Sequence, residues 1–321
     1  MFRALCLLFA IAVSCQALAD PNPKPFENWK TDFSKNAVDL SEIVSGGPPK
    51  DGIPAIENPL FVELDVAVEK YADKEPVIVL AHHDDTRAYP LSVLTWHEIA
   101  NDVIGGMPVT VTYCPLCNAS IAFSRVVDGR TLDFGTTGRL RNSDLIMYDR
   151  QTETWWQQFT GTAIVGELTG SKLTMLPSTV MPFSQFRKRY PQGRVLVPEN
   201  PSMRRYGSNP YAYYDSSNVP FLYRGEMPEG IDPMERVVIV ETEKGAVIWT
   251  LNAIRIAGEL ELGDVKVSWQ PGMASALDTP LIADGRDVGH LSATTNGRGV
   301  IHHQTFAFVA HAFHPEIEIE R

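Results

Sequence analysis

The chain has 321 residues, 44% of them hydrophobic, and its 28 basic and 39 acidic side chains give a net charge of −11. A chain of this length can bury a large core, in one large domain or two smaller ones. The acidic balance argues against nucleic acid or an anionic membrane as the main partner, because both require a basic surface.

The N-terminus has the pattern of a secretory signal peptide over residues 1–19. Arg3 supplies a positive charge, an apolar core follows over residues 4–15, and Ala19 ends a small-x-small cleavage site. This core is too short for a membrane span, which needs roughly 20 apolar residues, and no later stretch reaches that length. We therefore predict a periplasmic or secreted protein, cleaved after Ala19 and without a transmembrane segment. Cleavage would remove two of the four cysteines.

Residues 20–58 show little periodicity, so we predict an extended N-terminal arm there. From residue 59, short runs of β-branched and aromatic residues between Gly and Pro predict many strands. The expected strands include 77–80, 86–89, 109–113, 121–127 and 132–136, with Asp128-Gly129 as a hairpin turn. Apolar residues at roughly helical spacing predict a helix over 90–104, and a second short helix is expected over 184–190.

Two pairs of segments resemble each other along the chain. Residues 75–94 align with 235–254, and 109–121 align with 265–277, with apolar positions and turns in register. We interpret this pattern as a duplication. It predicts that residues 109–127 form a hairpin-like turn and that residues 265–283 superpose on it.

The duplication defines the expected fold class and domains. We predict a strand-rich α+β protein of two duplicated β-rich lobes with short helices. The first lobe would span residues 59–200 and carry the CPLC motif, a linker would span 201–230, and the second, degenerate lobe would span 231–321.

The two copies differ at residues that could carry chemistry. Cys114 and Cys117 align with Gln270 and Met273, and His97 aligns with an alanine. The proline of the CPLC turn is present in both copies, so the turn itself belongs to the architecture. Side chains added to one of two equivalent scaffolds are candidates for function.

The CPLC motif favours a metal site. The residues after Cys117 alternate in the manner of a strand, and a strand–CPLC–strand pattern is typical of a metal knuckle, in which Asn118 tolerates the left-handed backbone of the turn. Two sulfurs do not close a tetrahedral site, so the other ligands must be His, Met or carboxylate, which suits copper or an open zinc site. His97 is the preferred third ligand, on the helix that leads back to the strand of Cys114. Glu98 would point about 100° away from it on that helix.

Two other functions are compatible with the same motif. A thiol–disulfide oxidoreductase would use Cys114 as the attacking thiol and Cys117 as the resolving one. A small-ligand-binding module would keep the two cysteines only as a structural disulfide that braces the turn. Its cleft would be lined by Arg139, Arg141, Tyr148 and Trp156.

A second dense region of polar residues runs from Phe134 to Gln158. Its glycines and threonines could form a loop that cradles an anion, or a hairpin with a buried Arg–Asp pair. The polar residues of this loop would be Arg139, Arg141, Asn142, Ser143 and Asp144.

With these motifs in view, the chain resembles the bacterial family called domain of unknown function 3179. The resemblance runs from Gly52 to about Ile319 and rests on the blocks AYPL, WHEIAND, VTYCPLC, SDLIMYDRQTE and FHP. It implies secretion and site residues within these blocks, namely Cys114, Cys117, His97, Asn142, Ser143, Met147, Tyr148, Asp149, Arg150, Trp156 and His314. Trp155 and His311 depart from the family's pattern and are not expected in the site. The resemblance implies no particular reaction.

These arguments lead to one set of predicted site residues. The predicted metal ligands, for copper or zinc, are Cys114, Cys117 and His97. The predicted ligand-binding residues are Arg139, Asn142, Ser143, Tyr148, Arg150 and Trp156. The expected partner is a small ligand or a metal-delivery protein.

Overall fold

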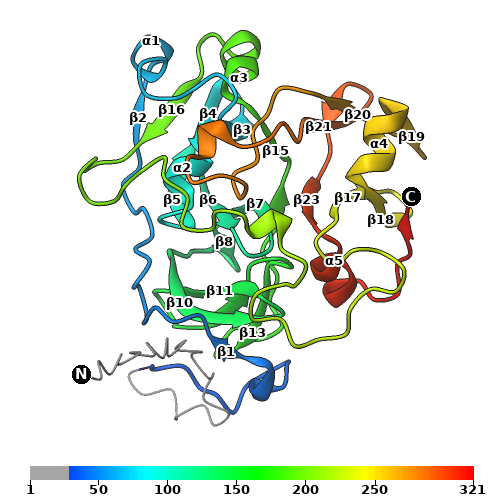
Figure 1. Cartoon of the computed structure of the whole chain (residues 1–321). Coiled ribbons are helices and arrows are strands. Elements are labelled where there is room, and N and C mark those ends of the chain that lie inside the picture. Colours follow the sequence, from blue (N-terminus) through cyan, green and yellow to red (C-terminus); the bar gives the residue numbers. More distant parts are fainter. Residues whose placement is uncertain (1–28) are drawn as a thin grey trace, which may run out of the picture.

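The computed structural model describes residues 29–321, so the predicted signal peptide lies outside the described residues. Strand accounts for 41% of the residues and helix for 13%. The described residues form five sheets of four or five strands, which are arranged as a five-bladed β-propeller, and one small two-stranded sheet (Figure 1). No helix among them is long and apolar enough to cross a membrane.

Three of the blades come mainly from the first two thirds of the chain. One blade consists, in spatial order, of β15 (Ser178–Pro182), β3 (Pro76–His82), β4 (Asp85–Pro90), β16 (Arg194–Val197) and β2 (Leu60–Val62). The next consists of β14 (Met175–Leu176), β7 (Ala119–Ser124), β6 (Met107–Cys114) and β5 (Ile99–Ile104). The third consists of β1 (Val44–Ser45), β10 (Phe134–Arg141), β11 (Asp144–Asp149), β12 (Trp155–Gln157) and β13 (Thr162–Val165).

The other two blades come from the C-terminal third of the chain. One consists of β23 (His302–Phe306), β17 (Arg236–Thr242), β18 (Gly245–Thr250) and β24 (Ile319–Glu320), and the other of β19 (Glu259–Leu262), β20 (Val265–Gln270), β21 (His290–Thr295) and β22 (Arg298–Gly299). The two-stranded sheet pairs β8 (Val126–Val127) with β9 (Arg130–Thr131). The helices are short: α1 (Leu64–Ala67), α2 (Leu91–Leu94), α3 (Phe183–Arg189), α4 (Leu251–Ala257), α5 (Ala307–Phe313), and the 3-10 turns η1 (Leu40–Glu42), η2 (Tyr214–Ser216) and η3 (Ile282–Asp284).

Tight turns with left-handed backbone join neighbouring strands within the blades. The turn between β10 and β11 consists of Asn142 and Ser143, with φ of 54° and 63°. Gly105 and Gly106 form the corresponding turn between β5 and β6. Two-residue turns of this kind match the right-handed twist of the flanking strands, and therefore fix which residues face each other across the hairpin.

The internal repeat is present as a repeated order of elements. Each aligned block forms a hairpin, a short helix and a second hairpin: β3, β4, α2, β5 and β6 in the first copy, and β17, β18, α4, β19 and β20 in the second. The two hairpins of one copy belong to two different sheets. The prediction of two duplicated lobes is therefore wrong, because each copy builds parts of two propeller blades.

The two copies diverge after the shared proline. β6 turns directly into β7, whereas residues 271–289 separate β20 from β21. In this loop, Ser275 Oγ and Arg286 Nη1 donate to the buried carboxylate of Asp215, at 2.5 and 2.8 Å. These charge-assisted bonds hold the loop away from a hairpin path. The expectation that residues 265–283 superpose on the CPLC turn is therefore wrong.

The predicted helix over residues 90–104 is also wrong beyond its first turn. The helix ends at Leu94, and residues 99–104 form β5. Glu98 has a φ of 59°, which breaks the helical path and starts the strand. Most of the segment is buried, so its apolar residues satisfied a helical spacing without forming a helix.

Candidate metal centre

The CPLC motif forms the predicted hairpin turn. Cys114 is the last residue of β6 and faces Ala119, the first residue of β7. Asn118 has a φ of 51°, and its N–H donates to the carbonyl of Pro115 at 3.1 Å. A strand follows Cys117, so the thiols lack the helix N-terminus that lowers the thiol pKa in disulfide oxidoreductases.

A second hairpin brings a carboxylate to the two thiols. The Asn142-Ser143 turn places Asp144 at the start of β11, and the ligand atoms of Cys114, Cys117 and Asp144 all lie within 4.8 Å of one another. All three side chains are inside the protein, with exposures of 2%, 0% and 0%. Two thiols and a carboxylate converging at one buried point form a group that could hold a metal ion.

The two oxygens of Asp144 differ in their surroundings. Oδ2 accepts hydrogen bonds from Gln157 Nε2 at 2.6 Å and from the Phe159 N–H at 2.9 Å. Oδ1 is buried and accepts no N–H or O–H hydrogen bond in the part of the chain that the structure describes, and the thiols of Cys117 and Cys114 are the remaining donors beside this carboxylate. Leaving a buried acceptor without a partner costs about 1–3 kcal/mol, and more for a charged group. Oδ1 is therefore free to coordinate a cation, while Oδ2 fixes the orientation of the carboxylate.

The charges around the thiols are acidic. Burial raises the pKa of the Cys114 thiol, and the nearby carboxylates of Asp144 and Glu98 raise it further. Burial also raises the pKa of Cys117 well above its ordinary value, that of Asp144 to about 6 and that of Glu98 to about 8. Reactive thiols are normally found in electropositive, partly exposed surroundings. A buried cluster of acidic side chains favours the binding of a cation, and a bound cation would lower these raised pKa values.

The rest of the turn is held by other blades. Ser143 O lies 3.4 Å from Cys117 Sγ, and the Thr305 hydroxyl of β23 donates to the carbonyl of Cys117 at 2.8 Å. Both cysteines also belong to a core cluster with Phe123 of β7 and Phe306 of β23. The site therefore lies where three blades meet.

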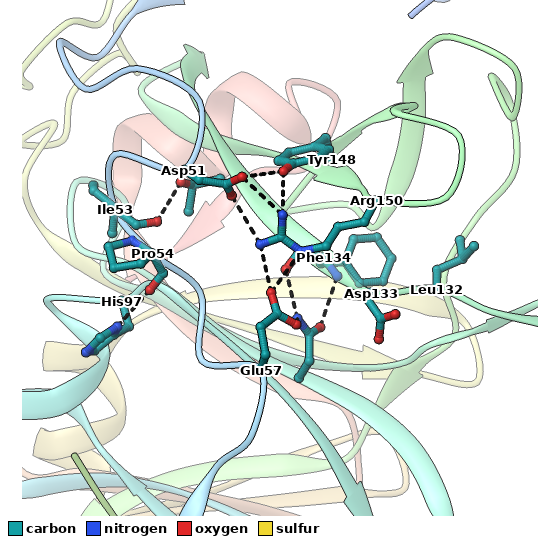
Figure 2. Close-up of polar contacts among 12 residues, drawn as sticks. Asp51, Ile53, Pro54, Glu57, His97, Leu132, Asp133, Phe134, Tyr148 and Arg150 are labelled. Atoms are coloured by element: carbon teal, nitrogen blue, oxygen red, sulfur yellow. Dashed lines mark hydrogen bonds and ion pairs between the residues drawn. The ribbon is translucent and has the colours of Figure 1, made fainter. Parts of the chain in front are cut away.

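His97 lies apart from this group. Its Nδ1 is 2.7 Å from the carbonyl of Pro54 (Figure 2). Its Nε2 is 2.8 Å from the Tyr206 hydroxyl. Because the helix ends at Leu94, the backbone does not carry His97 toward Cys114 as expected. The structure thus joins Asp144 to the thiols, and it joins His97 to the N-terminal segment.

Tyr148 and Arg150, both predicted to bind a ligand, hold the same N-terminal segment. The Tyr148 hydroxyl donates to Asp51, and Arg150 bonds Asp51 from Nη1 at 3.0 Å and Glu57 from Nε at 2.8 Å (Figure 2). Asn101 adds a bond from Nδ2 to Glu57 at 3.0 Å. We call Asp51, Glu57, Tyr148 and Arg150 the clamp. It ties residues 51–57 to β11.

Arg150→Ala tests the role of the clamp. Because the guanidinium is about one third exposed, we expect a loss of about 1 kcal/mol in the free energy of unfolding. Limited proteolysis should also cut residues 51–57 faster, while zinc affinity stays unchanged. Arg130→Ala, which removes an exposed ion pair with Glu167 at 3.4 Å, is the matched control and should change neither property. Unchanged stability and proteolysis in Arg150→Ala would contradict the clamp.

The other predicted ligand-binding residues have structural neighbours. The run expected to form an anion-cradling loop is strand β10, in which Arg139 faces Ile146 and Arg141 Nε bonds Glu42 at 2.6 Å. Asn142 and Ser143 form the hairpin turn. Trp156 is fully buried, and its indole N–H donates to Asp149 at 2.9 Å.

Sequence reasoning missed two acidic residues near the thiols. The sequence places Asp144 in an anion-binding loop or in a hairpin with a buried Arg–Asp pair, and a helix through Glu98 would turn this side chain away from His97. The two-residue turn at Asn142-Ser143 was the available signal, since it predicts that Asp144 starts a strand at a hairpin tip. No local pattern indicated which other hairpin tip it would meet.

A comparison with protein families agrees with the extent of these motifs. The family model described as protein of unknown function (DUF3179) matches residues 50–317. The chain belongs to this family. The DUF3179 segment begins next to Asp51 of the clamp and contains Cys114, Cys117 and Asp144. No curated protein and no solved structure matches the chain.

Proposed function

We propose that this DUF3179 protein binds one zinc ion through Cys114, Cys117 and Asp144. The observation that carries the proposal is the buried Asp144 carboxylate, which has an oxygen within 4.8 Å of both sulfurs and whose Oδ1 accepts no N–H or O–H hydrogen bond among the described residues. The acidic surroundings support a cation over a reactive thiolate. The raised thiol pKa values weigh against thiol–disulfide exchange at neutral pH.

The mixture of ligands favours zinc over copper. Cu(I) prefers soft thiolate and thioether ligands, whereas zinc accepts both thiolate and carboxylate. An oriented carboxylate beside two thiols therefore favours zinc over Cu(I). Three protein ligands leave one position of a tetrahedral ion for water or for a ligand from a metal-delivery protein. If the N-terminal segment directs secretion, bound zinc would also keep the two thiols from forming a disulfide outside the cytoplasm.

Zinc titration of the reduced protein at several pH values tests this function. We expect one zinc per chain, with affinity rising about 100-fold per pH unit around pH 7, because both thiols are then protonated and must release a proton to bind zinc. Below about pH 6 the zinc affinity should fall still more steeply as the pH is lowered, because Asp144 also becomes protonated.

The control for this titration is Cys114→Ser, which should lose the thiolate-to-cobalt absorption when Co²⁺ replaces zinc. Elemental analysis of protein purified without chelator provides a second readout. A reduced wild type that binds none of zinc, Co²⁺ and Cu(I) would end the metal hypothesis in favour of a redox or structural pair of cysteines.

A further inference from the structure

A long connection between β16 and β17 covers the proposed metal site. We call residues 211–223 the cover segment, part of the connection drawn in yellow-green in Figure 1. Tyr211, Tyr214, Leu222 and Tyr223 pack against the core cluster that contains both cysteines. Apart from η2, the cover segment has no helix or strand, whereas strands β6, β7 and β11 and the hydroxyl of Thr305 in β23 hold the other sides of the site.

Two hydroxyl groups attach the cover segment to the two hairpin tips. The Tyr214 hydroxyl donates to the carbonyl of Leu116, inside the CPLC turn, at 3.0 Å and accepts from the Phe221 N–H at 3.2 Å. The Ser143 hydroxyl donates to the carbonyl of Phe221 at 2.6 Å. The residues that neighbour Cys117 and Asp144 in sequence are therefore the points of attachment.

The cover segment has features of an element that can detach. Tyr213 and Leu222 have φ of 67° and 55°, a left-handed conformation that is unfavourable for bulky side chains. Leu222 follows Phe221, whereas Tyr213 lies close to Asp215, whose buried carboxylate is bound by Ser275 and Arg286. Detachment is therefore confined to the part of the segment after Asp215. Tyr213, Val219 and Phe221 are 62%, 64% and 55% exposed, so little packing holds the outer side. Segments with few buried contacts open locally at lower cost than core strands.

We propose that the cover segment is the gate of the metal site. Its residues 217–222 lift away from Ser143 and Tyr214 and admit metal ions and thiol reagents to Cys114 and Cys117, while Asp215 stays bound to Ser275 and Arg286. The metal part of this proposal rests on the proposed function, and the thiol part does not. Breaking an attachment should therefore speed entry and exit equally, without altering the ligands.

The rate of thiol alkylation measures the gate without any metal. The reduced, metal-free full chain is treated with N-ethylmaleimide, and modification of each cysteine is read by peptide mass spectrometry. Tyr214→Phe should raise the rate at Cys114 and Cys117 about tenfold, since one hydroxyl with two hydrogen bonds is lost. Ser143→Gly should act in the same direction, because glycine keeps the left-handed turn and removes only the attachment.

Tyr223→Phe is the matched control. Its hydroxyl donates to Glu226 O at 2.8 Å, within the same connection, and should leave the alkylation rate unchanged. Low urea concentrations should also change the alkylation rate of the wild type far less than they change its equilibrium constant for global unfolding. The proposal is overturned if Tyr214→Phe and Tyr223→Phe have the same alkylation rate. It is also overturned if the alkylation rate rises with urea in parallel with the equilibrium constant for global unfolding.

Zinc release separates the gate from the metal function. With zinc bound, transfer to a chelator should accelerate in Tyr214→Phe by the same factor as alkylation, while the equilibrium affinity stays unchanged. Faster alkylation in a protein that binds no zinc would support the gate and refute the metal site. Zinc binding with no change in either rate would refute the gate alone.

Discussion

Replacing Asp144 with asparagine should lower the affinity for zinc at least about 100-fold, because changes outside the ligand shell already cost 10–100-fold. The variant keeps the size of the side chain and its contacts with Gln157 and Phe159, but it loses the negative charge. Burial raises the pKa of Asp144 to about 6, so its ionised form opposes folding at neutral pH. The metal-free variant should therefore be no less stable than the wild type. Competition with a chromophoric chelator measures the affinity.

The same variant distinguishes zinc from copper. Cu(I) bound by two thiolates needs no carboxylate, so Asp144→Asn should retain copper affinity while losing zinc affinity. His97→Ala serves as the control and should leave zinc affinity within about twofold, because both ring nitrogens bond elsewhere. If His97→Ala loses zinc and Asp144→Asn keeps it, the ligand set proposed here is wrong.

Replacing Trp156 with alanine should lower the free energy of unfolding by about 3–5 kcal/mol. The side chain is fully buried, its ring centroid lies 5.8 Å from that of Phe134, and its N–H bonds Asp149. Alanine removes this packing and leaves Asp149 with one donor fewer. Urea unfolding monitored by circular dichroism provides the value.

Two controls support the interpretation of Trp156. Val219→Ala, at an exposed position, should change stability by less than about 0.5 kcal/mol. Trp156→Phe should restore most of the packing and lose mainly the hydrogen bond to Asp149. A loss below about 1 kcal/mol in Trp156→Ala would favour the earlier prediction that this side chain lines a ligand cleft.

Local features of the fold could be predicted from the sequence. The CPLC turn, the left-handed Asn118 and the strand after Cys117 follow from turn chemistry and alternation, and the structure confirms them. The short helix α3 and the long connection after β16 were also expected. These features depend on neighbouring residues, which is why one sequence is enough to predict them.

Long-range features could not be predicted in the same way. The repeat indicated the order of elements, but not that each hairpin joins a different sheet. Asp144 meets the thiols because two hairpin tips from different blades converge, and neither hairpin encodes the other. The sequence places His97 on a helix because its buried segment matches a helical spacing, whereas the left-handed backbone of Glu98 breaks that helical path.

The bond between Thr305 and Cys117 has a consequence for the order of assembly. Thr305 is made long after the three proposed ligands, and its hydroxyl holds the carbonyl of Cys117 in the CPLC turn. A chain still being synthesised would thus present two unprotected thiols before the partner that fixes their backbone exists. We expect this interval to be when the protein is most exposed to oxidation and mispairing. If the protein binds zinc as proposed, the ion would protect these thiols only after the backbone of Cys117 has been fixed by Thr305.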